Sequence, residues 1–343
     1  MNIGIIGYGK MGSSIFRLLS GKPHNVTVLM RSEEKAKDSE KKFFKGLQRS
    51  LKRATLTEDE FLRKKETLRF THRVEDLASA DLVAETAVEN FQEKVDIFRR
   101  LESVVDKNAV LVTNTSSISI KDLAEKLKYK ERFCGLHFFY PVLLIDLVEI
   151  IRCADTPMGL ISFLKDFCKR INIKPIVVHD APGSVINAIL AYYYVEALYI
   201  LEEGLALPSK VDELARRFCY VGPCESMDII GIDFFIEALE TAATPGSLLP
   251  INWKESSQAE LSKTVTGGRE GFFVPHLFKK LIPENRIGKK VSKGIYLYER
   301  ERLVDDLPEF YVNPSRSFSY ENINKDQELI AKRLLYSIFN GSL

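Results

Sequence analysis

The sequence predicts an α/β domain built on a parallel sheet, followed by an all-α domain. Short β-branched runs alternate with longer amphipathic stretches over the first half of the chain, a pattern typical of strands joined by covering helices. The alternation ends at Asp180-Ala181-Pro182-Gly183, and the pattern beyond it is helical. The chain has 343 residues, of which 45% are hydrophobic, more than one ordinary domain holds. We therefore expect two domains, residues 1–182 and 183–343.

The expected elements follow the chain in order. Strands are expected where β-branched and aromatic residues cluster between turn residues, at Asn2–Ile6, Val26–Met30, Leu68–Phe70, Asp81–Ala84, Ala109–Thr113, Phe133–Phe138, Leu147–Ile151 and Pro175–Val178. Helices of the first domain are expected between them, at Lys10–Ser20, Glu33–Ala54, Asn90–Val105, Ser119–Lys126 and Pro157–Arg170. Helices of the second domain are expected at Ser184–Glu203, from Pro208, at Ser226–Ala242, and at about 326–340 as an extra C-terminal helix.

Charge and cysteine content exclude several classes of protein. Forty-nine Lys and Arg against 47 Asp and Glu leave a net charge of +2, so no overall field attracts nucleic acid or an anionic membrane. No run approaches the ~20 apolar residues of a membrane span, and Met1 directly precedes a strand without a basic leader. The five cysteines are scattered, which favours neither a disulfide framework nor a metal cluster. We expect a cytoplasmic protein that binds small molecules and no metal.

A glycine-rich turn directly follows the first expected strand and opens the first helix. Its sequence is Gly7-Tyr8-Gly9-Lys10-Met11-Gly12. Gly7 permits a tight turn, Gly9 lets a pyrophosphate approach the backbone, and Gly12 lets helix and strand pack closely. N–H groups at the helix start would then face the anion. This context predicts a Rossmann-type dinucleotide site that includes Met11; the alternative is a glycine turn that binds nothing.

The end of the second expected strand bears on the choice between NAD and NADP. An Asp or Glu at this place usually holds the adenosine ribose hydroxyl of NAD. This sequence has Met30-Arg31-Ser32 instead. Arg31 suits the 2′-phosphate of NADP. The alternative is that Arg31 is a solvated residue and that NAD is bound with one contact fewer, so both cofactors stay open.

The second expected helix carries a basic face. Between residues 41 and 57 there are six basic residues and no acidic one, and helical spacing puts most of them on one side. They are Lys41, Lys42, Lys45, Arg49, Lys52 and Arg53. Such a face could receive the phosphates of coenzyme A, with Lys45, Arg49 and Arg53 as substrate contacts. The alternative is an ordinary solvated surface.

Several further segments, in order along the chain, resemble the 3-hydroxyacyl-CoA dehydrogenase family. The resemblance extends over about residues 1 to 300 and is carried by Asn114-Thr115-Ser116-Ser117, Gly135-Leu136-His137-Phe138-Phe139-Tyr140-Pro141, Leu147-Val148-Glu149-Ile150, Asp180-Ala181-Pro182-Gly183 with Asn187, Val221-Gly222-Pro223, Asp228-Ile229-Ile230-Gly231-Ile232-Asp233 and Asn285-Arg286-Ile287-Gly288-Lys289-Lys290. The region from Glu328 to Phe339 resembles the start of a second helical repeat in fused β-oxidation proteins. The resemblance implies a dehydrogenase of 3-hydroxyacyl-CoA and a homodimer through the helical domain.

The residues also make chemical sense without the family. Oxidising a secondary alcohol needs a base for the hydroxyl proton, and a histidine serves in both directions near neutral pH. Of the five histidines, His137 is the best candidate because it lies at the end of an expected strand. Glu149 on the next strand would lie beside it if the two strands pair antiparallel. A carboxylate there would orient the imidazole, as in a hydrolase triad; the alternative is a structural histidine.

The resemblance implies roles for several other residues. Ser116 and Asn187 would hydrogen-bond the substrate near its reacting oxygen, with Ser116 also near the nicotinamide; the alternative for each is a helix cap. Cofactor contacts are implied for the residues Glu89, Lys94, Tyr140 and Lys290. A solvated helix face is the alternative for Lys94.

The chain departs from the family pattern at three positions. Tyr140 stands where the family usually has Asn, Ser184 where it has Phe, and Ala188 where it has Arg. We therefore expect an NAD(P)-dependent 3-hydroxyacyl-CoA dehydrogenase. Two alternatives remain: a dehydrogenase of a free hydroxy acid or another acyl carrier, and a catalytically silent nucleotide-binding protein.

Overall fold

A computed structural model describes residues 1–143, 145–180, 184–236, 251–252, 272–273, 275–299, 302–305, 311 and 325–340. The chain divides into two compact units, Met1–Asp180 and Ala181–Leu343. The predicted boundary between residues 182 and 183 lies two residues after this division and outside the described residues.

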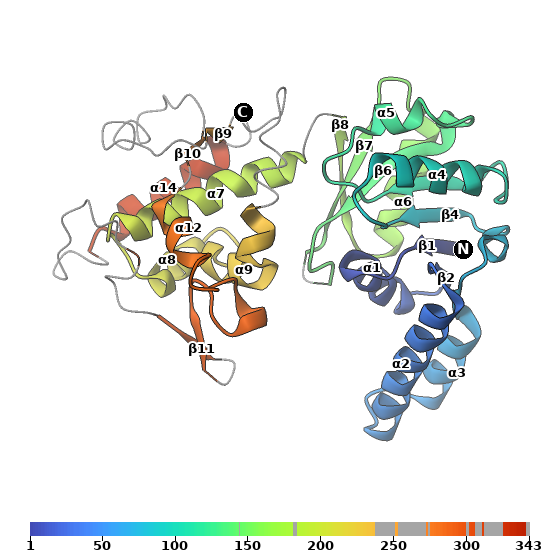
Figure 1. The fold of residues 1–343 in the computed structure, drawn as a ribbon, viewed down its shortest axis with the longest axis horizontal. Coiled ribbons are helices and arrows are strands. Elements are labelled where there is room, and N and C mark those ends of the chain that lie inside the picture. The colour runs from blue at the N-terminus through green and yellow to red at the C-terminus, as the bar shows by residue number, and fades with distance from the viewer. Residues whose placement is uncertain are drawn as a thin grey trace. The chain divides into compact units, whose positions relative to one another are not determined.

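The first unit contains an eight-stranded sheet in the order β3-β2-β1-β4-β5-β6-β7-β8 (Figure 1). Its strands are β1 Asn2–Ile6, β2 Asn25–Leu29, β3 Leu68–Thr71, β4 Leu82–Glu85, β5 Val110–Thr113, β6 Phe133–Phe138, β7 Leu147–Arg152 and β8 Lys174–His179. All eight predicted strands are present, with ends shifted by at most one residue. The first six strands in chain order are parallel, β7 is antiparallel to β6, and β8 is parallel to β7. The sheet is therefore parallel over six strands, and the last two strands, β7 and β8, run in the opposite direction.

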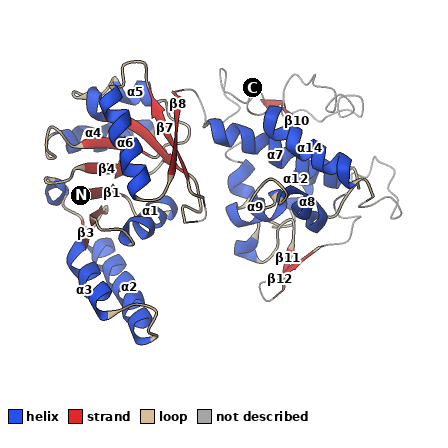
Figure 2. Cartoon of the chain, turned by 180° about the vertical axis from the view of Figure 1, so that it is seen from behind, coloured by secondary structure: helices blue, strands red, loops and turns tan. Residues whose placement is uncertain are grey.

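Helices cover both faces of this sheet (Figure 2). They are α1 Lys10–Ser20, α2 Glu33–Lys52, α3 Glu58–Thr67, α4 Phe91–Glu102, α5 Ile120–Ala124 and α6 Met158–Arg170, with 3₁₀ turns η1 Val74–Leu77 and η2 Lys130–Arg132. Apolar residues of α1 and α6 pack with one face of the strands, and those of α4 and α5 pack with the other. The result is the three-layer α/β architecture expected from alternating strands and helices.

The α3 helix was not predicted from the sequence. It lies beside α2, and Figure 1 shows the two helices projecting together from the sheet. Thr57 caps α3 by accepting a hydrogen bond from the Glu60 N–H at 3.2 Å, and the Glu60 carboxylate accepts one from the Thr57 N–H at 2.9 Å. This reciprocal capping box is visible in the sequence as Thr57-Glu58-Asp59-Glu60, a signal that could have located the helix.

The second unit is mainly helical. Its elements are α7 Val185–Glu202, α8 Pro208–Ala215, α9 Pro223–Ile230, α12 His276–Leu281, η4 Lys289–Val291 and α14 Gln327–Asn340, with short strand pairs β9 Ile251–Asn252 with β10 Phe272–Phe273 and β11 Leu297–Glu299 with β12 Arg302–Val304. The extra C-terminal helix is confirmed as α14. The single helix predicted at Ser226–Ala242 is wrong: α9 ends at Ile230, and Gly231 has a φ of +105°, which breaks the helix. Helix resumes at 232–236, and residues 237–242 lie outside the described part of the chain.

Buried polar groups hold the second unit together. Asp212 is fully buried and accepts hydrogen bonds from the Cys224 N–H at 2.8 Å and the Tyr296 hydroxyl at 2.8 Å. Arg333 of α14 pairs with Glu196 of α7 at 2.5 Å and also with Glu203. Because the buried Arg333 meets the buried Glu196 and the partly buried Glu203, these pairs fix α14 on α7.

The α7 helix corrects the expectation about membrane spans. It has 18 residues and is apolar enough, by length and composition, to cross a membrane. Most of it is buried within the helical unit, where residues such as Leu198 and Ile200 belong to the core. A core helix of a globular unit accounts for these features.

Candidate active site

The glycine turn occupies the carboxyl end of β1, where open α/β sheets bind ligands. Gly7 has a φ of +92°, a conformation that side chains disfavour. A Cβ on Gly12 would lie 2.3 Å from the Gly7 carbonyl oxygen, whereas a Cβ on Gly9 would meet nothing within 4 Å. The tight turn at Gly7 and the close packing at Gly12 are therefore confirmed, while the approach of a pyrophosphate to Gly9 stays a prediction. Met11 is partly buried beside the turn and packs on the sheet.

Arg31 lies just past the end of β2, which is next to β1 in the sheet. Its Nη2 is 2.8 Å from Oε2 of Glu93, in the first turn of α4. The side chains are 68% and 50% exposed. Arg31 is therefore solvated, which agrees with the alternative to a phosphate contact. It is also paired with a carboxylate from a distant part of the sequence.

His137 and Glu149 are directly paired across β6 and β7. Nδ1 of His137 lies 2.9 Å from Oε2 of Glu149, and the two residues are 5% and 0% exposed. Because a carboxylate can only accept, Nδ1 carries the hydrogen in this bond. The imidazole also contacts the ring of Phe139 edge to face, with centroids 4.6 Å apart. The arrangement fixes the ring and its tautomer, as a proton-transferring histidine needs.

The loop after β5 is organised by Glu89. Its carboxylate accepts from the Ser116 and Ser117 N–H groups, each at 3.2 Å, from the Ser117 hydroxyl at 2.8 Å, and from the Thr115 hydroxyl. Burial would raise the pKa of Glu89, but the hydrogen bonds from Thr115 and Ser117 and the charge of Lys94 outweigh burial and lower the pKa below its usual value. Ser116 itself is exposed, and the cap of α5 is Ser119, so the cap alternative for Ser116 is wrong.

Lys94 is 1% exposed, so the alternative of a solvated helix face is wrong. Its Nζ lies 2.8 and 2.9 Å from the two oxygens of Glu85 and 3.4 Å from Oε2 of Glu89. Glu85 is fully buried at the end of β4 and also accepts from the Thr113 hydroxyl at 2.6 Å. Sequence reasoning missed Glu85; its signal is an acid that closes the buried run Leu82-Val83-Ala84. Lys94 thus positions the loop of Ser116 through Glu89.

Two contacts join the separate segments of this edge. Asn114 lies two residues before Ser116, and Phe138 lies one residue after His137. The side-chain oxygen of Asn114 accepts a hydrogen bond from the Phe138 N–H at 2.9 Å. Nζ of Lys10, in the glycine turn, lies 4.3 Å from the ring centroid of Tyr140. Tyr140 therefore lies beside Lys10 of the glycine turn, while its contact with the cofactor stays a prediction. The role of Asn114 was not predicted.

The remaining predicted site residues of the second unit are Asn187 and Lys290. Asn187 lies in the first turn of α7, whose cap is Ser184, so the cap alternative for Asn187 is wrong. The same bond, from the Asn187 N–H to Ser184 Oγ at 3.2 Å, gives Ser184 a structural role where the family usually has Phe. Nζ of Lys290 is 2.8 Å from Oδ1 of Asp233.

The basic face of α2 is exposed along its length, including Lys45, Arg49 and the C-cap residue Arg53. Phe44, which shares the opposite side, packs against the core of the sheet. The predicted amphipathic division of α2 is confirmed, while its contact with coenzyme A stays a prediction.

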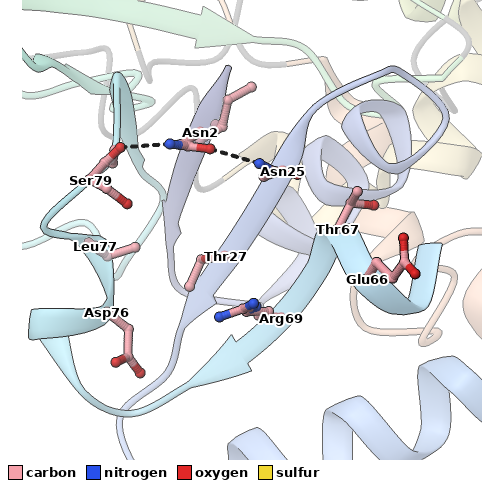
Figure 3. A pocket seen from close by; sticks show the side chains of 11 residues that line it. Asn2, Asn25, Thr27, Glu66, Thr67, Arg69, Asp76, Leu77 and Ser79 are labelled. Carbon is pink, nitrogen blue, oxygen red and sulfur yellow. Dashed lines mark hydrogen bonds between the residues drawn. The ribbon is translucent and has the colours of Figure 1, made fainter. Parts of the chain in front are cut away.

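A polar pocket of 220 Å³ lies near the amino-terminal ends of the strands, opposite the carboxyl ends that hold the glycine turn (Figure 3). It is not part of the candidate active site. It is lined by residues such as Asn2, Asn25 and Arg69, at the amino-terminal ends of β1 and β2 and within β3. Within the described ranges, no three His, Cys, Asp or Glu residues are grouped so as to hold a metal ion. All five cysteines are free.

Comparisons with known proteins agree with this arrangement. The model of the 3-hydroxyacyl-CoA dehydrogenase NAD binding domain matches residues 2–181, and that of the C-terminal domain matches residues 183–298. The chain is 30% identical over 316 residues to a mitochondrial hydroxyacyl-coenzyme A dehydrogenase of Sus scrofa, covering 87% of this chain and 91% of that protein.

Solved structures extend the comparison. The (S)-3-hydroxybutyryl-CoA dehydrogenase of Ralstonia eutropha has a TM-score of 0.68 at 29% identity, covering 87% of this chain and 99% of that one. The dehydrogenase part of a multifunctional enzyme of C. elegans has a TM-score of 0.69 at 24% identity, covering 99% of this chain and 73% of that one, which indicates a shared fold. The chain belongs to the 3-hydroxyacyl-CoA dehydrogenase family.

Proposed function

We propose that this protein is a dinucleotide-dependent dehydrogenase that interconverts (S)-3-hydroxyacyl-CoA and 3-oxoacyl-CoA. The observation that carries the proposal is the buried His137–Glu149 pair at 2.9 Å, on the sheet edge that also holds the glycine turn. A histidine fixed by a carboxylate supports proton transfer at a secondary alcohol. The similarity to a hydroxyacyl-coenzyme A dehydrogenase and to an (S)-3-hydroxybutyryl-CoA dehydrogenase supports an acyl-CoA substrate.

His137 is the general base in the oxidation direction. The ring nitrogen Nδ1 is committed to Glu149, so Nε2 takes the proton of the substrate hydroxyl. Glu149 stabilises the resulting imidazolium, because its negative charge lies within hydrogen-bond distance of the ring. In the reduction direction the imidazolium returns the proton to the forming alkoxide. Hydride transfer to or from the same carbon atom would be the chemistry that a bound NAD(P) supplies.

Two further side chains position the substrate in this proposal. The Ser116 hydroxyl donates to the reacting oxygen, and the Glu89 carboxylate holds the Ser116 backbone in place. Asn187 is proposed as a second side-chain donor to the substrate. Both donors favour the polarised carbonyl and the alkoxide over the neutral alcohol.

The glycine turn fits a dinucleotide. The open space beside Gly9 lets an anion approach the backbone, and Gly9 brings no side chain to cap α1. Phosphate oxygens can therefore accept from N–H groups of the first helical turn. Glu89 and Tyr140 lie on the same edge and would line the nicotinamide half. Lys94 is buried and would support the cofactor site through its 3.4 Å contact with Glu89 rather than by touching the cofactor. Lys290 is proposed as a contact from the helical unit.

The exposed basic face of α2 is proposed to bind the phosphates of coenzyme A. Lys45, Arg49 and Arg53 are solvated and able to move toward a flexible, multiply charged ligand. A free hydroxy acid would have no use for such a face, which favours the acyl-CoA over the alternative substrate.

An assay of acetoacetyl-CoA and free acetoacetate, each with NADH and NADPH, tests the proposed function. We expect reduction of acetoacetyl-CoA and very slow reduction of acetoacetate. Equal rates on both substrates would favour the free hydroxy acid dehydrogenase, and no reduction with dinucleotide still bound would favour the silent binding protein. The homodimer and the cytoplasmic location stay predictions, the first of which sedimentation measurements can test.

A further inference from the structure

We propose that Glu93 is a specificity-determining residue of the dinucleotide site and that its ion pair with Arg31 favours NAD over NADP. The inference rests on the proposed function, because it assumes that the glycine turn binds a dinucleotide. The observation is the 2.8 Å contact between Arg31 Nη2 and Glu93 Oε2. The two residues are 62 positions apart in the sequence.

The pair lies at the part of the fold where the 2′ substituent of adenosine is recognised. That place is the carboxyl end of β2 in dinucleotide-binding sheets. Arg31 lies two residues after Leu29, the last residue of β2, and Glu93 belongs to α4, which follows β4. Since β2 and β4 flank β1, the ion pair links the two segments on either side of the glycine turn.

Glu93 supplies in space the acid that is missing from the sequence. The usual Asp or Glu closes β2 itself, whereas here the carboxylate arrives from the first turn of α4. Its backbone is fixed, because the Asn90 side chain accepts from the Glu93 N–H at 3.0 Å. Glu60, the equivalent residue of α3, folds back on its own cap, but the Glu93 carboxylate is directed to Arg31.

The charges of the pair explain the expected preference. A 2′-phosphate carries nearly two negative charges at neutral pH, and the Glu93 carboxylate offsets the cation that would attract it. A ribose hydroxyl is neutral and is not repelled. Without Glu93, Arg31 could form a charge-assisted bond with the phosphate. Glu93 therefore turns an arginine that suits NADP into part of a site that suits NAD.

The test measures the affinity of the whole protein for NADH and NADPH by isothermal titration, without acyl-CoA. Wild type is expected to bind NADH more tightly. Glu93→Gln should raise the affinity for NADPH about five- to thirtyfold and leave NADH within about twofold, the effect of a nearby unit charge in a water-exposed site. The gain should shrink at high salt. Arg31→Ala combined with Glu93→Gln should abolish it.

Asp96→Asn is the matched control, since Asp96 is an exposed acid three residues further along α4. It removes the same charge and should leave the NADH to NADPH ratio unchanged. An unchanged ratio in Glu93→Gln, an equal change in Asp96→Asn, or a wild type that prefers NADPH would overturn the role of Glu93. Failure of wild type to bind either dinucleotide would instead contradict the proposed function, so the two failures are distinguishable.

Discussion

Two regions at the carboxyl ends of the strands, one at β4 to β7 and one at β2, are built differently. At β4 to β7, polar side chains such as Lys94, Glu85, His137 and Glu149 are at most 5% exposed and pair as Lys94 with Glu85 and His137 with Glu149. At β2, the Arg31–Glu93 pair is exposed, and so is the basic face of α2. Buried pairs are costly to rearrange, whereas exposed pairs are weak and screened by salt. We infer that the buried end fixes the chemistry and that the exposed end selects the ligands.

The largest expected effect is on catalysis at the buried end. Glu149→Gln should lower kcat for acetoacetyl-CoA reduction by about 10²–10⁴, because His137 loses the carboxylate that stabilises its charged form. His137→Gln added to this variant should lower kcat little further, because the two residues act as a unit. Steady-state rates of both variants check this. If the fold losses of kcat in the two single variants multiply in the double variant, the residues act independently.

The next largest effect is expected on the free energy of unfolding, at the buried Lys94–Glu85 pair. Lys94→Met should lower the free energy of unfolding by about 3–5 kcal/mol, because it leaves the buried Glu85 carboxylate without its cation. Combining it with Glu85→Gln should recover most of the loss. Urea unfolding measures both. Lys37→Met, at an exposed i,i+4 pair with Glu33, is the control and should change little. A Lys94→Met protein as stable as the control would remove the contrast between the two ends.

A smaller effect is expected at the exposed end. Lys45→Glu combined with Arg49→Glu should raise KM for acetoacetyl-CoA about tenfold at low salt, because only the phosphates of coenzyme A meet those charges. KM for a short pantetheine analogue should stay unchanged, and the difference should fade as salt is added. If KM rises equally for both substrates, the basic face is structural.

The smallest effect concerns pH at Glu89. Its pKa is lowered in the folded protein, so the ionised form adds stability above its unfolded pKa and this stability is lost as pH falls through the folded pKa. Glu89→Gln should therefore be less stable than wild type at about pH 7 by ~1 kcal/mol or less, since the side chain is 40% exposed, and the difference should vanish as pH falls below the folded-state pKa of Glu89. A difference that grows toward low pH would contradict the network around Ser116.

Much of the fold follows from local patterns in the sequence. The eight strands of the first unit were predicted because buried parallel strands are short, β-branched runs between turn residues. The helix from Ser226 was extended too far because its apolar period continues across Gly231, and only the positive φ of that glycine ends it. The α3 helix was missed because its residues are mostly charged and carry little apolar period.

The site was predictable only where two residues are near in sequence or on neighbouring strands. His137 and Glu149 were paired correctly because a single turn fixes the register of two antiparallel strands. The partners of Arg31 and Lys94 come from other elements, and their burial and contacts depend on how α4 lies on the sheet. Linear spacing does not contain that information, so Glu93 and Glu85 were not foreseen.

The central claim is that the His137–Glu149 pair transfers the proton while the cofactor is held elsewhere. The most direct test compares wild type and His137→Gln in one preparation, by NADH affinity and by the single-turnover rate of acetoacetyl-CoA reduction. The account predicts unchanged NADH affinity and a rate lowered by about 10²–10⁴. A rate close to that of wild type, with NADH still bound, would contradict it.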